Sequence, residues 1–235
     1  MASLSLQHTR ILDLSRVLAG PLCTMMLGDL GADVIKVERP GHGDETREWG
    51  PPFDASGASA YYLAVNRNKL SVAADFTRDA VLIRSLVASA DVVVENFLPG
   101  ALASVGLSPD ELVHANPKLV WCSINGFGAN SPRPGYDFVV QAETGWMSIT
   151  GEPDGEPMKA GVALADIIAG KDATIAILAA LTGLARGNPV ERRLTISLAE
   201  SARAALINAA HNAMVSGADA TRWGNSHANL TPYQL

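Results

Sequence analysis

An aspartate inside an apolar segment is the residue whose type and setting most strongly indicate chemistry. Residues 159–173 read KAGVALADIIAGKDA, so Asp166 lies among apolar neighbours, with Gly161 and Gly170 on either side. A carboxylate in such surroundings is poorly solvated and is therefore available as a nucleophile or a base. The alternative explanation is an acid at a helix N-terminus, where the helix dipole stabilises negative charge. The apolar neighbours favour the reactive role.

Other candidate binding residues follow segments that read as strands. Arg39 comes directly after the β-rich run 33–38, and its planar guanidinium is suited to a phosphate or an adenine ring. An exposed surface arginine is the alternative. Asn96 and Phe97 end the run 91–97, where a polar amide and an aromatic ring would face a ligand. A strand-ending asparagine is common in α/β folds, so this signal is weak by itself.

Metal and dinucleotide sites are not indicated. No pair of the five histidines has the spacing of a metal site, so we expect no metal. The turn after the first strand reads LAGPLC and lacks the G-x-G-x-x-G pattern that binds a pyrophosphate, which argues against NAD. Cys23 and Cys122 lie in apolar surroundings without CxxC spacing, which indicates buried thiols in a reducing compartment.

The segments that must position these residues alternate between strand and helix patterns. The strand patterns cover residues 10–15, 33–38, 69–75, 91–97, 119–125 and 192–198. The helix patterns begin at Gly20-Pro21, at 79, at Ser108, where a capping box starts, near 163, and at 199, with the last one ending at 214. Strand, helix and strand in succession predict parallel pairing, and uninterrupted apolar strands predict helices on both faces. We therefore expect an α/β fold with an open, doubly wound, mostly parallel Rossmann-like sheet and long flanking helices.

Two long stretches between these elements read as irregular, at residues 39–68 and 126–136. Both are rich in glycine and proline, and they combine aromatic and charged residues. Long loops in compact domains are often functional, and ligands of doubly wound sheets bind beyond the carboxyl ends of the strands. Because both stretches begin at such strand ends, we expect them to border the ligand site.

Composition limits the class of protein. The chain has 235 residues, of which 48% are hydrophobic and 18% charged, which excludes a disordered or fibrous protein. The formal charge of −6 argues against a nucleic-acid partner. The N-terminal MASLSLQHTR lacks the apolar core of a signal peptide, and no run of about 18 uncharged apolar residues occurs. We expect a soluble, cytoplasmic protein with no membrane partner.

Five stretches of the chain, taken together, resemble the family III CoA-transferases. They are DLSRVLAGPLCTMMLGDLGADVIKVERPGHGDETR, YYLAVNRNKLSVAAD, DVVVENFLPGAL, PGYDFVVQAETGWMSITGEPDG and GVALADIIAG. They keep the family order and spacing from about residue 9 to the last residue. Within the family the resemblance is tightest to succinyl-CoA:glutarate-type enzymes, through TREWGPPF, NRNK and RWGNSHANLTPYQ. The resemblance implies CoA transfer from an acyl-CoA such as succinyl-CoA to a small carboxylic or dicarboxylic acid.

The resemblance also assigns roles to individual residues. It implies that Asp166 is the nucleophile, which forms a mixed anhydride with the acyl group and then an aspartyl-CoA thioester. Water must be excluded from such a site, because an anhydride hydrolyses readily. The implied CoA-contacting positions, with Arg39 at the nucleotide end, are Leu18, Arg39, Ala74, Asn96, Phe97, Tyr136 and Asp137. CoA and acyl-CoA are then substrates, and no permanently bound cofactor is expected.

Three departures within the family bear on substrate and reaction. Formyl-CoA transferase has glutamine where this chain has Leu18, which suggests a different acid substrate, and arginine where it has Ser104, which removes one phosphate contact. The related α-methylacyl-CoA racemases have a histidine at Tyr136, and a phenol with a pKa near ~10 is a poor replacement for imidazole. Transfer is therefore favoured over the alternative, a 2-methylacyl-CoA racemase or epimerase. A non-catalytic CoA-binding fragment is the other alternative.

The resemblance predicts the organisation of the chain. Residues 1–198 are expected to form the CoA-binding α/β domain that carries the nucleophile. Residues 199–235 are expected to form a helix and linker that lead toward a second domain absent from this chain. Family members continue past this point and form interlocked homodimers. We therefore expect the chain to be either a fragment of a longer protein, dimeric at full length, or a truncated gene product.

Overall fold

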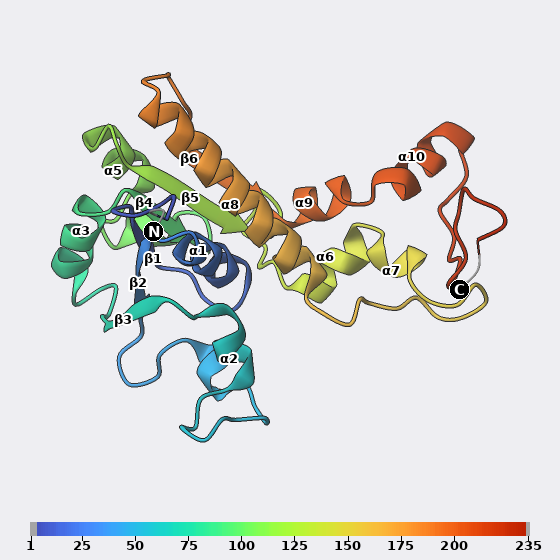
Figure 1. The fold of residues 1–235 in the computed structure, drawn as a ribbon, viewed down its shortest axis with the longest axis horizontal. Coiled ribbons are helices and arrows are strands. Elements are labelled where there is room, and N and C mark those ends of the chain that lie inside the picture. The colour runs from blue at the N-terminus through green and yellow to red at the C-terminus, as the bar shows by residue number, and fades with distance from the viewer. Residues whose placement is uncertain (1–3, 234–235) are drawn as a thin grey trace.

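The chain folds around one parallel sheet. The structure is a computed structural model that describes residues 4–233; residues 1–3 and 234–235, which include the first residues of MASLSLQHTR and Gln234 of RWGNSHANLTPYQ, lie outside this range. The strands are β1 (Arg10–Asp13), β2 (Asp33–Glu38), β3 (Lys69–Ala73), β4 (Val92–Glu95), β5 (Val120–Asn125) and β6 (Arg193–Ser197). They pair in parallel in the order β3-β2-β1-β4-β5-β6 (Figure 1). The predicted doubly wound sheet is confirmed.

Helices cover both faces of this sheet. The first layer contains α1 (Ala19–Asp29), α8 (Leu164–Ala185) and α9 (Leu198–Ala204). The second layer contains α3 (Ala80–Ala88), α4 (Ala101–Ser104) and α5 (Pro109–Ala115). Strand β4 shows why both layers form, because Val92 and Val94 pack into the first hydrophobic core and Val93 into the second. The apolar strands are therefore buried on both faces, as the sequence predicted.

Local sequence signals mark several boundaries of these elements. All the observed strands begin and end within two residues of the predicted ones. The Ser108 hydroxyl accepts a hydrogen bond from the Glu111 N–H at 3.5 Å, and Pro109 occupies the first turn of α5. The capping box therefore starts α5 where it was predicted. Helix α1 begins at Ala19, one residue before the predicted Gly20-Pro21 start.

The single helix predicted over residues 199–214 is wrong. The structure has two helices there, α9 and α10 (Ile207–Ser216). The indole N–H of Trp146 donates to the Ala202 carbonyl at 2.8 Å, and the Leu206 N–H turns to Arg203 instead. Ile207 then has a left-handed φ of +42°. A tertiary contact thus interrupts a sequence pattern that is helical throughout.

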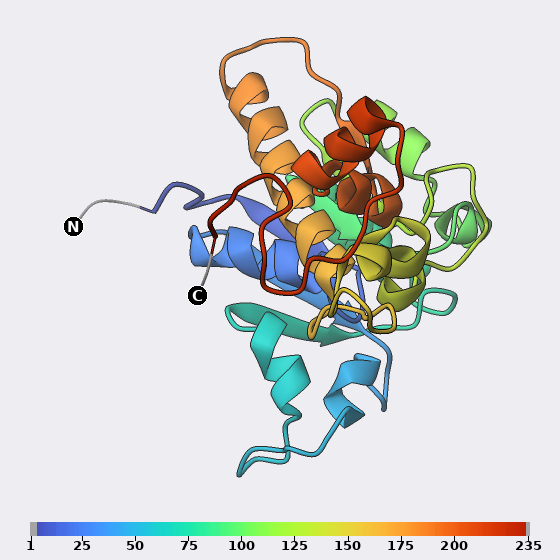
Figure 2. The same ribbon diagram turned by 90° about the vertical axis from the view of Figure 1, so that its right-hand side faces the viewer.

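The stretch 39–68 is less irregular than predicted. It contains the 3₁₀ helix η1 (Glu45–Glu48) and helix α2 (Ala60–Val65), which the Ser59 hydroxyl caps by accepting from the Tyr61 N–H. Both elements are too short for a clear periodic pattern. In both views the segment extends away from the sheet, below β3 (Figures 1 and 2). The other stretch, 126–136, is irregular as predicted.

Helix α8 is long and apolar enough, by length and composition, to cross a membrane. In this fold one side of it packs on the sheet through Ala169, Ala173 and Ile177. Of an apolar stretch of 18 residues in this helix, 39% is buried. A core helix of an α/β layer has the same composition. The absence of a membrane partner stays a prediction.

Helices α1 and α8 approach each other closely at Gly170. A β-carbon added there would lie 2.7 Å from the backbone oxygen of Ala19, whereas one added at Gly161 would meet nothing within 4 Å. We expect Gly170→Ala to lower the free energy of unfolding by about 1–3 kcal/mol, the usual cost of overpacking. The matched Gly161→Ala variant should change it by less than about 1 kcal/mol. Urea denaturation measures both, and equal stabilities would contradict this packing argument.

The C-terminal part of the described chain extends from one end of the sheet. Helices α6 (Asp137–Glu143), α7 (Trp146–Ile149) and α10 lie there together with the final segment (Figure 1). The Arg222 guanidinium joins the final segment to the loop after α7 by donating to the carbonyls of Glu152 and Gly155, at 3.1 and 2.6 Å. The domain boundary between residues 198 and 199 stays a prediction.

Candidate active site

Two adjacent clefts lie where the parallel strands end. The Asp166 cleft, about 430 Å³ in volume, is lined by the turn after β1, the segments after β4 and β5, and the start of α8. The Arg39 cleft, about 480 Å³, is lined by residues that follow β1, β2 and β3. Arg16, Glu45 and Phe97 line both clefts, so the two adjoin each other. Their position is the one where doubly wound sheets bind ligands.

The structure brings all the predicted site residues to these two clefts. Those that line the Asp166 cleft are Leu18, Asn96, Phe97, Tyr136, Asp137 and Asp166. Arg39 and Ala74 line the Arg39 cleft together with Phe97. This grouping suits one elongated ligand that lies across both clefts. The role of each residue in binding stays a prediction.

Asp166 has the setting expected of a reactive carboxylate. It lies in the first turn of α8, half-buried, and faces the Asp166 cleft. Burial raises the pKa of its carboxyl group to about 7, and the nearby negative charge of Asp137 adds to the rise. Within residues 4–233 its carboxylate accepts no hydrogen bond from the protein, so no hydrogen bond offsets the burial. Near neutral pH the group is thus available as an ionised, weakly solvated nucleophile.

Asp137 caps the helix that carries Asp166. Its Oδ1 accepts hydrogen bonds from the N–H groups of Ala165 at 2.7 Å and Asp166 at 3.3 Å. Ala163 at the N-cap of α8 has no side chain able to do this, so the cap comes from the first residue of α6. The family resemblance implied only CoA contact for Asp137. The structure adds a second role, because the same carboxylate holds α8 and raises the pKa of Asp166.

Gln141 is a site residue that the sequence analysis missed. It is fully buried, and its Nε2 donates to Asp137 Oδ2 at 2.6 Å and to the Val162 carbonyl at 3.3 Å. Its Oε1 accepts from the Ala160 N–H at 2.8 Å. One side chain therefore fixes both the cap and the segment that leads into α8. The available signal was the i, i+4 spacing from Asp137, which places the two on one helix face.

Asn96 uses its amide in a way the sequence did not suggest. Oδ1 accepts from the Arg16 N–H at 2.9 Å, and Nδ2 donates to the Arg16 carbonyl at 2.8 Å. The amide thus binds the turn after β1 and is occupied within the protein. Phe97 lies between the clefts, with its ring edge-on to Phe76 at 5.0 Å and the Arg16 guanidinium 5.9 Å from its centre.

The remaining predicted residues differ in exposure. Arg39 is exposed at the end of β2, whereas Ala74 is buried and its N–H donates to the Glu38 carbonyl at 3.0 Å. Tyr136 is exposed at the start of α6. Ser104 lines neither cleft, and its hydroxyl donates to the Ala101 carbonyl at 2.7 Å. Within the described range no three His, Cys, Asp or Glu side chains gather as metal ligands would.

Comparison with known sequences shows which family and which relatives this chain resembles. Residues 6–235 match the profile of CoA-transferase family III. The chain is 48% identical over 240 residues to a succinate–glutarate CoA-transferase of Agrobacterium fabrum, covering 98% of this chain and 60% of the relative. It is 45% identical over 236 residues to the human succinyl-CoA:glutarate CoA-transferase, covering 97% of this chain and 53% of the relative. The chain therefore spans between half and two thirds of the length of these curated relatives.

Comparison with solved structures agrees. The fold matches the crystal structure of a CAIB/BAIF family protein from Brucella suis with a TM-score of 0.91 and 46% sequence identity. The match covers 99% of this chain and 63% of that protein. The sheet, its helical layers and the segment that carries Asp166 are thus shared with a known structure over nearly the whole chain.

Proposed function

The chain belongs to CoA-transferase family III, and on this premise we propose that it transfers CoA from an acyl-CoA to a small carboxylic or dicarboxylic acid. Succinyl-CoA is the proposed donor, because both relatives described above are named for succinate or succinyl-CoA together with glutarate. The acceptor is a mono- or dicarboxylate of similar size. These proposals concern the full-length protein.

The observation that carries the proposal is the Asp166 carboxylate. It is half-buried, it receives no hydrogen bond from any residue within 4–233, and it faces a cleft that adjoins a second cleft lined by Arg39. An acyl-CoA is long, with a nucleotide at one end and a thioester at the other. Two adjoining clefts, with a guanidinium in one and a weakly solvated nucleophile in the other, suit the two ends of such a molecule.

The proposed reaction proceeds through four exchanges at one carboxylate. An oxygen of Asp166 attacks the thioester carbon, the carbon–sulfur bond breaks, and CoA thiolate leaves behind a mixed anhydride. The thiolate attacks the Asp166 carbonyl carbon and releases the donor acid, which gives an aspartyl-CoA thioester. The acceptor carboxylate attacks this thioester, expels the thiolate and forms a new anhydride. The thiolate then attacks the acceptor carbonyl, and Asp166 is released as a carboxylate.

The cations of the Asp166 cleft support a carboxylate-bearing substrate. Arg16 and Arg133 line the cleft. Arg133 is held by a forked ion pair with Glu143 and lies over the Phe127 ring at 4.0 Å. The ion pair of Arg16 with Glu45, at 3.5 Å, is exposed and therefore worth little in water. Its guanidinium is thus the cation of this cleft best able to pair with a free substrate carboxylate.

Acyl exchange by the full-length protein tests the proposal. Succinyl-CoA is supplied with a panel of mono- and dicarboxylates, and the new acyl-CoA esters are identified by mass spectrometry. We expect CoA transfer to dicarboxylates, glutarate among them. Deuterium uptake at the α-position of a 2-methylacyl-CoA without acyl exchange would instead establish a racemase or epimerase. CoA binding with neither reaction would favour the non-catalytic alternative.

The remaining proposals concern the cell and the assembly. Exposed apolar side chains on α10, which are Ile207, Met214 and Val215, support the proposal that the full-length protein is a homodimer. Sedimentation of that protein tests this.

Cys23 and Cys122 are both free and buried, which supports a reducing, cytoplasmic compartment. We further propose that no cofactor is permanently bound and that no membrane or nucleic acid is a partner.

A further inference from the structure

The turn that follows β1 forms one wall of the Asp166 cleft and has an unusual backbone. It covers Ser15–Leu18, and Arg16, Val17 and Leu18 line the cleft. Val17 has a φ of +69°, in the left-handed region. A β-branched residue there is a genuine outlier, which persists only where the surrounding structure holds it. The question is what holds this turn.

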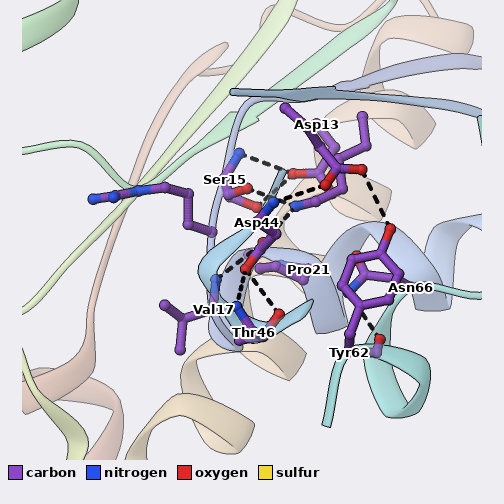
Figure 3. A network of polar contacts seen from close by, with 12 residues as sticks. Asp13, Ser15, Val17, Pro21, Asp44, Thr46, Tyr62 and Asn66 are labelled. Atoms are coloured by element: carbon purple, nitrogen blue, oxygen red, sulfur yellow. Dashed lines mark hydrogen bonds and ion pairs between the residues drawn. The ribbon is translucent and has the colours of Figure 1, made fainter. Parts of the chain in front are cut away.

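A network of buried charged side chains binds the backbone of this turn. Asp13 Oδ1 accepts from the Ser15 N–H at 2.9 Å, and the Lys36 ammonium donates to the Ser15 carbonyl at 2.7 Å. Asp44 Oδ2 accepts from the Val17 N–H at 3.4 Å and lies 3.0 Å from Lys36 (Figure 3). These three charged side chains are almost completely buried, with exposed fractions of 0% for Asp13, 1% for Lys36 and 2% for Asp44.

Asn96, which directly follows β4, binds the same turn. Its amide both accepts from the Arg16 N–H and donates to the Arg16 carbonyl. The backbone polar groups of Ser15 and Arg16, and the N–H of Val17, are therefore all paired with side chains from β1, β2, β4 or their following loops. The turn has few ways to relax while these bonds exist.

Net stability does not explain this network. A buried ion pair gains little over apolar residues of the same size, because removing the charges from water costs about as much as their attraction returns. What the network does provide is a fixed geometry for the turn. The turn is also coupled to the nucleophile's helix, since the carbonyl of Ala19 directly follows it and packs against Gly170 of α8.

We propose that Lys36, Asp44 and Asn96 are positioning residues that hold the Ser15–Leu18 turn, with Val17 in its left-handed conformation, at the geometry required opposite Asp166. The inference rests on the proposed function, because the acyl group must lie between this turn and the Asp166 carboxylate. Misplacement of one wall by about 1 Å is enough to reduce a rate about 100-fold. None of the three residues needs to touch the reacting atoms.

A rescue experiment in the full-length protein tests the role of Asp44. Asp44→Asn removes the charge that faces Lys36, with little change of size. It also leaves one acceptor oxygen for donors that now use two, the Thr46 N–H and hydroxyl on Oδ1 and the Val17 N–H on Oδ2. We expect kcat for acyl exchange to fall about 10–100-fold, and KM for acyl-CoA to stay within about threefold. Adding Val17→Gly should restore much of kcat, because glycine adopts the left-handed region without support. Adding Val17→Ala, the matched control, should not restore kcat. Equal kcat values in the two double variants would overturn the proposal.

Asn96→Ala provides a second test that leaves the buried charges intact. It removes both hydrogen bonds to Arg16 from a half-buried position, so the fold should survive, as circular dichroism would show. We expect a loss in kcat similar to that of Asp44→Asn. A rise in KM with kcat unchanged would make Asn96 a CoA-binding residue only and would overturn its positioning role.

Amide hydrogen exchange separates this inference from the proposed function. Peptides that contain the turn should exchange faster in Asp44→Asn and Asn96→Ala than in the wild type, while peptides from β5 should not change. Failure of the wild type to exchange acyl groups would refute the proposed function, and the amide rates would still decide whether these side chains hold the turn. Unchanged protection of the turn in both variants would refute the positioning role.

Discussion

Replacing Asp166 with asparagine is expected to abolish acyl exchange, with a loss of about 10³-fold or more, because no other group can take the place of a covalent nucleophile. Asparagine has nearly the same shape, and the Arg39 cleft is untouched by the change. CoA binding, measured by titration calorimetry, should therefore remain within a few-fold of the wild-type affinity. The matched control is Asp172→Asn, because Asp172 lies on the same helix and lines neither cleft.

Chemical trapping shows whether the loss reflects the proposed intermediate. The full-length protein is incubated with succinyl-CoA and treated with borohydride, which reduces an aspartyl thioester, or with hydroxylamine, which converts it to a hydroxamate. We expect the modified residue in the tryptic peptide to be Asp166, and no modification in Asp166→Asn. Modification of a different residue, or full exchange activity in Asp166→Asn, would contradict the mechanism.

The sheet was predictable from sequence because its strands are buried on both faces. Continuous apolar runs such as Val92–Val94 leave little choice of element, and the helices between them impose parallel pairing. The break between α9 and α10 was not predictable, since it depends on the Trp146 indole binding the Ala202 carbonyl, 56 positions away. Sequence periodicity describes one element at a time and does not register such contacts.

For the candidate site too, residue types and their local setting were predictable, whereas contacts between distant residues were not. The apolar neighbours of Asp166 indicated a poorly solvated acid, and the structure gives it a raised pKa. Of the two flanking glycines, Gly170 allows the close approach of α1, whereas Gly161 has open space around it. The cap from Asp137 and the use of the Asn96 amide depend on contacts across 28 to 80 positions, so residue types alone did not show them.

The raised pKa of Asp166 predicts that the nucleophile destabilises the fold at high pH. In the unfolded chain its carboxyl group titrates near the ordinary value of 3.8, and in the folded protein near 7. Between these values the folded state retains a proton that the unfolded state has lost. The free energy of unfolding contributed by this group therefore falls as pH rises from about 4 to about 7, and it is constant above that range.

Asp166→Asn should accordingly be more stable than the wild type at pH 8, although it is inactive. The rise from 3.8 to about 7 corresponds to as much as about 4 kcal/mol once the wild-type carboxylate is ionised. At pH 4 both folded proteins have a neutral side chain at this position, and their difference in stability should be much smaller than at pH 8. Urea denaturation at several pH values measures this difference, with Asp172→Asn as the control on the same helix. A difference that stayed constant from pH 4 to pH 8 would mean that Asp166 is solvated like a surface acid. In that case the site would lack the property that makes the carboxylate reactive, because the destabilisation and the nucleophilicity have the same origin in the loss of water around Asp166.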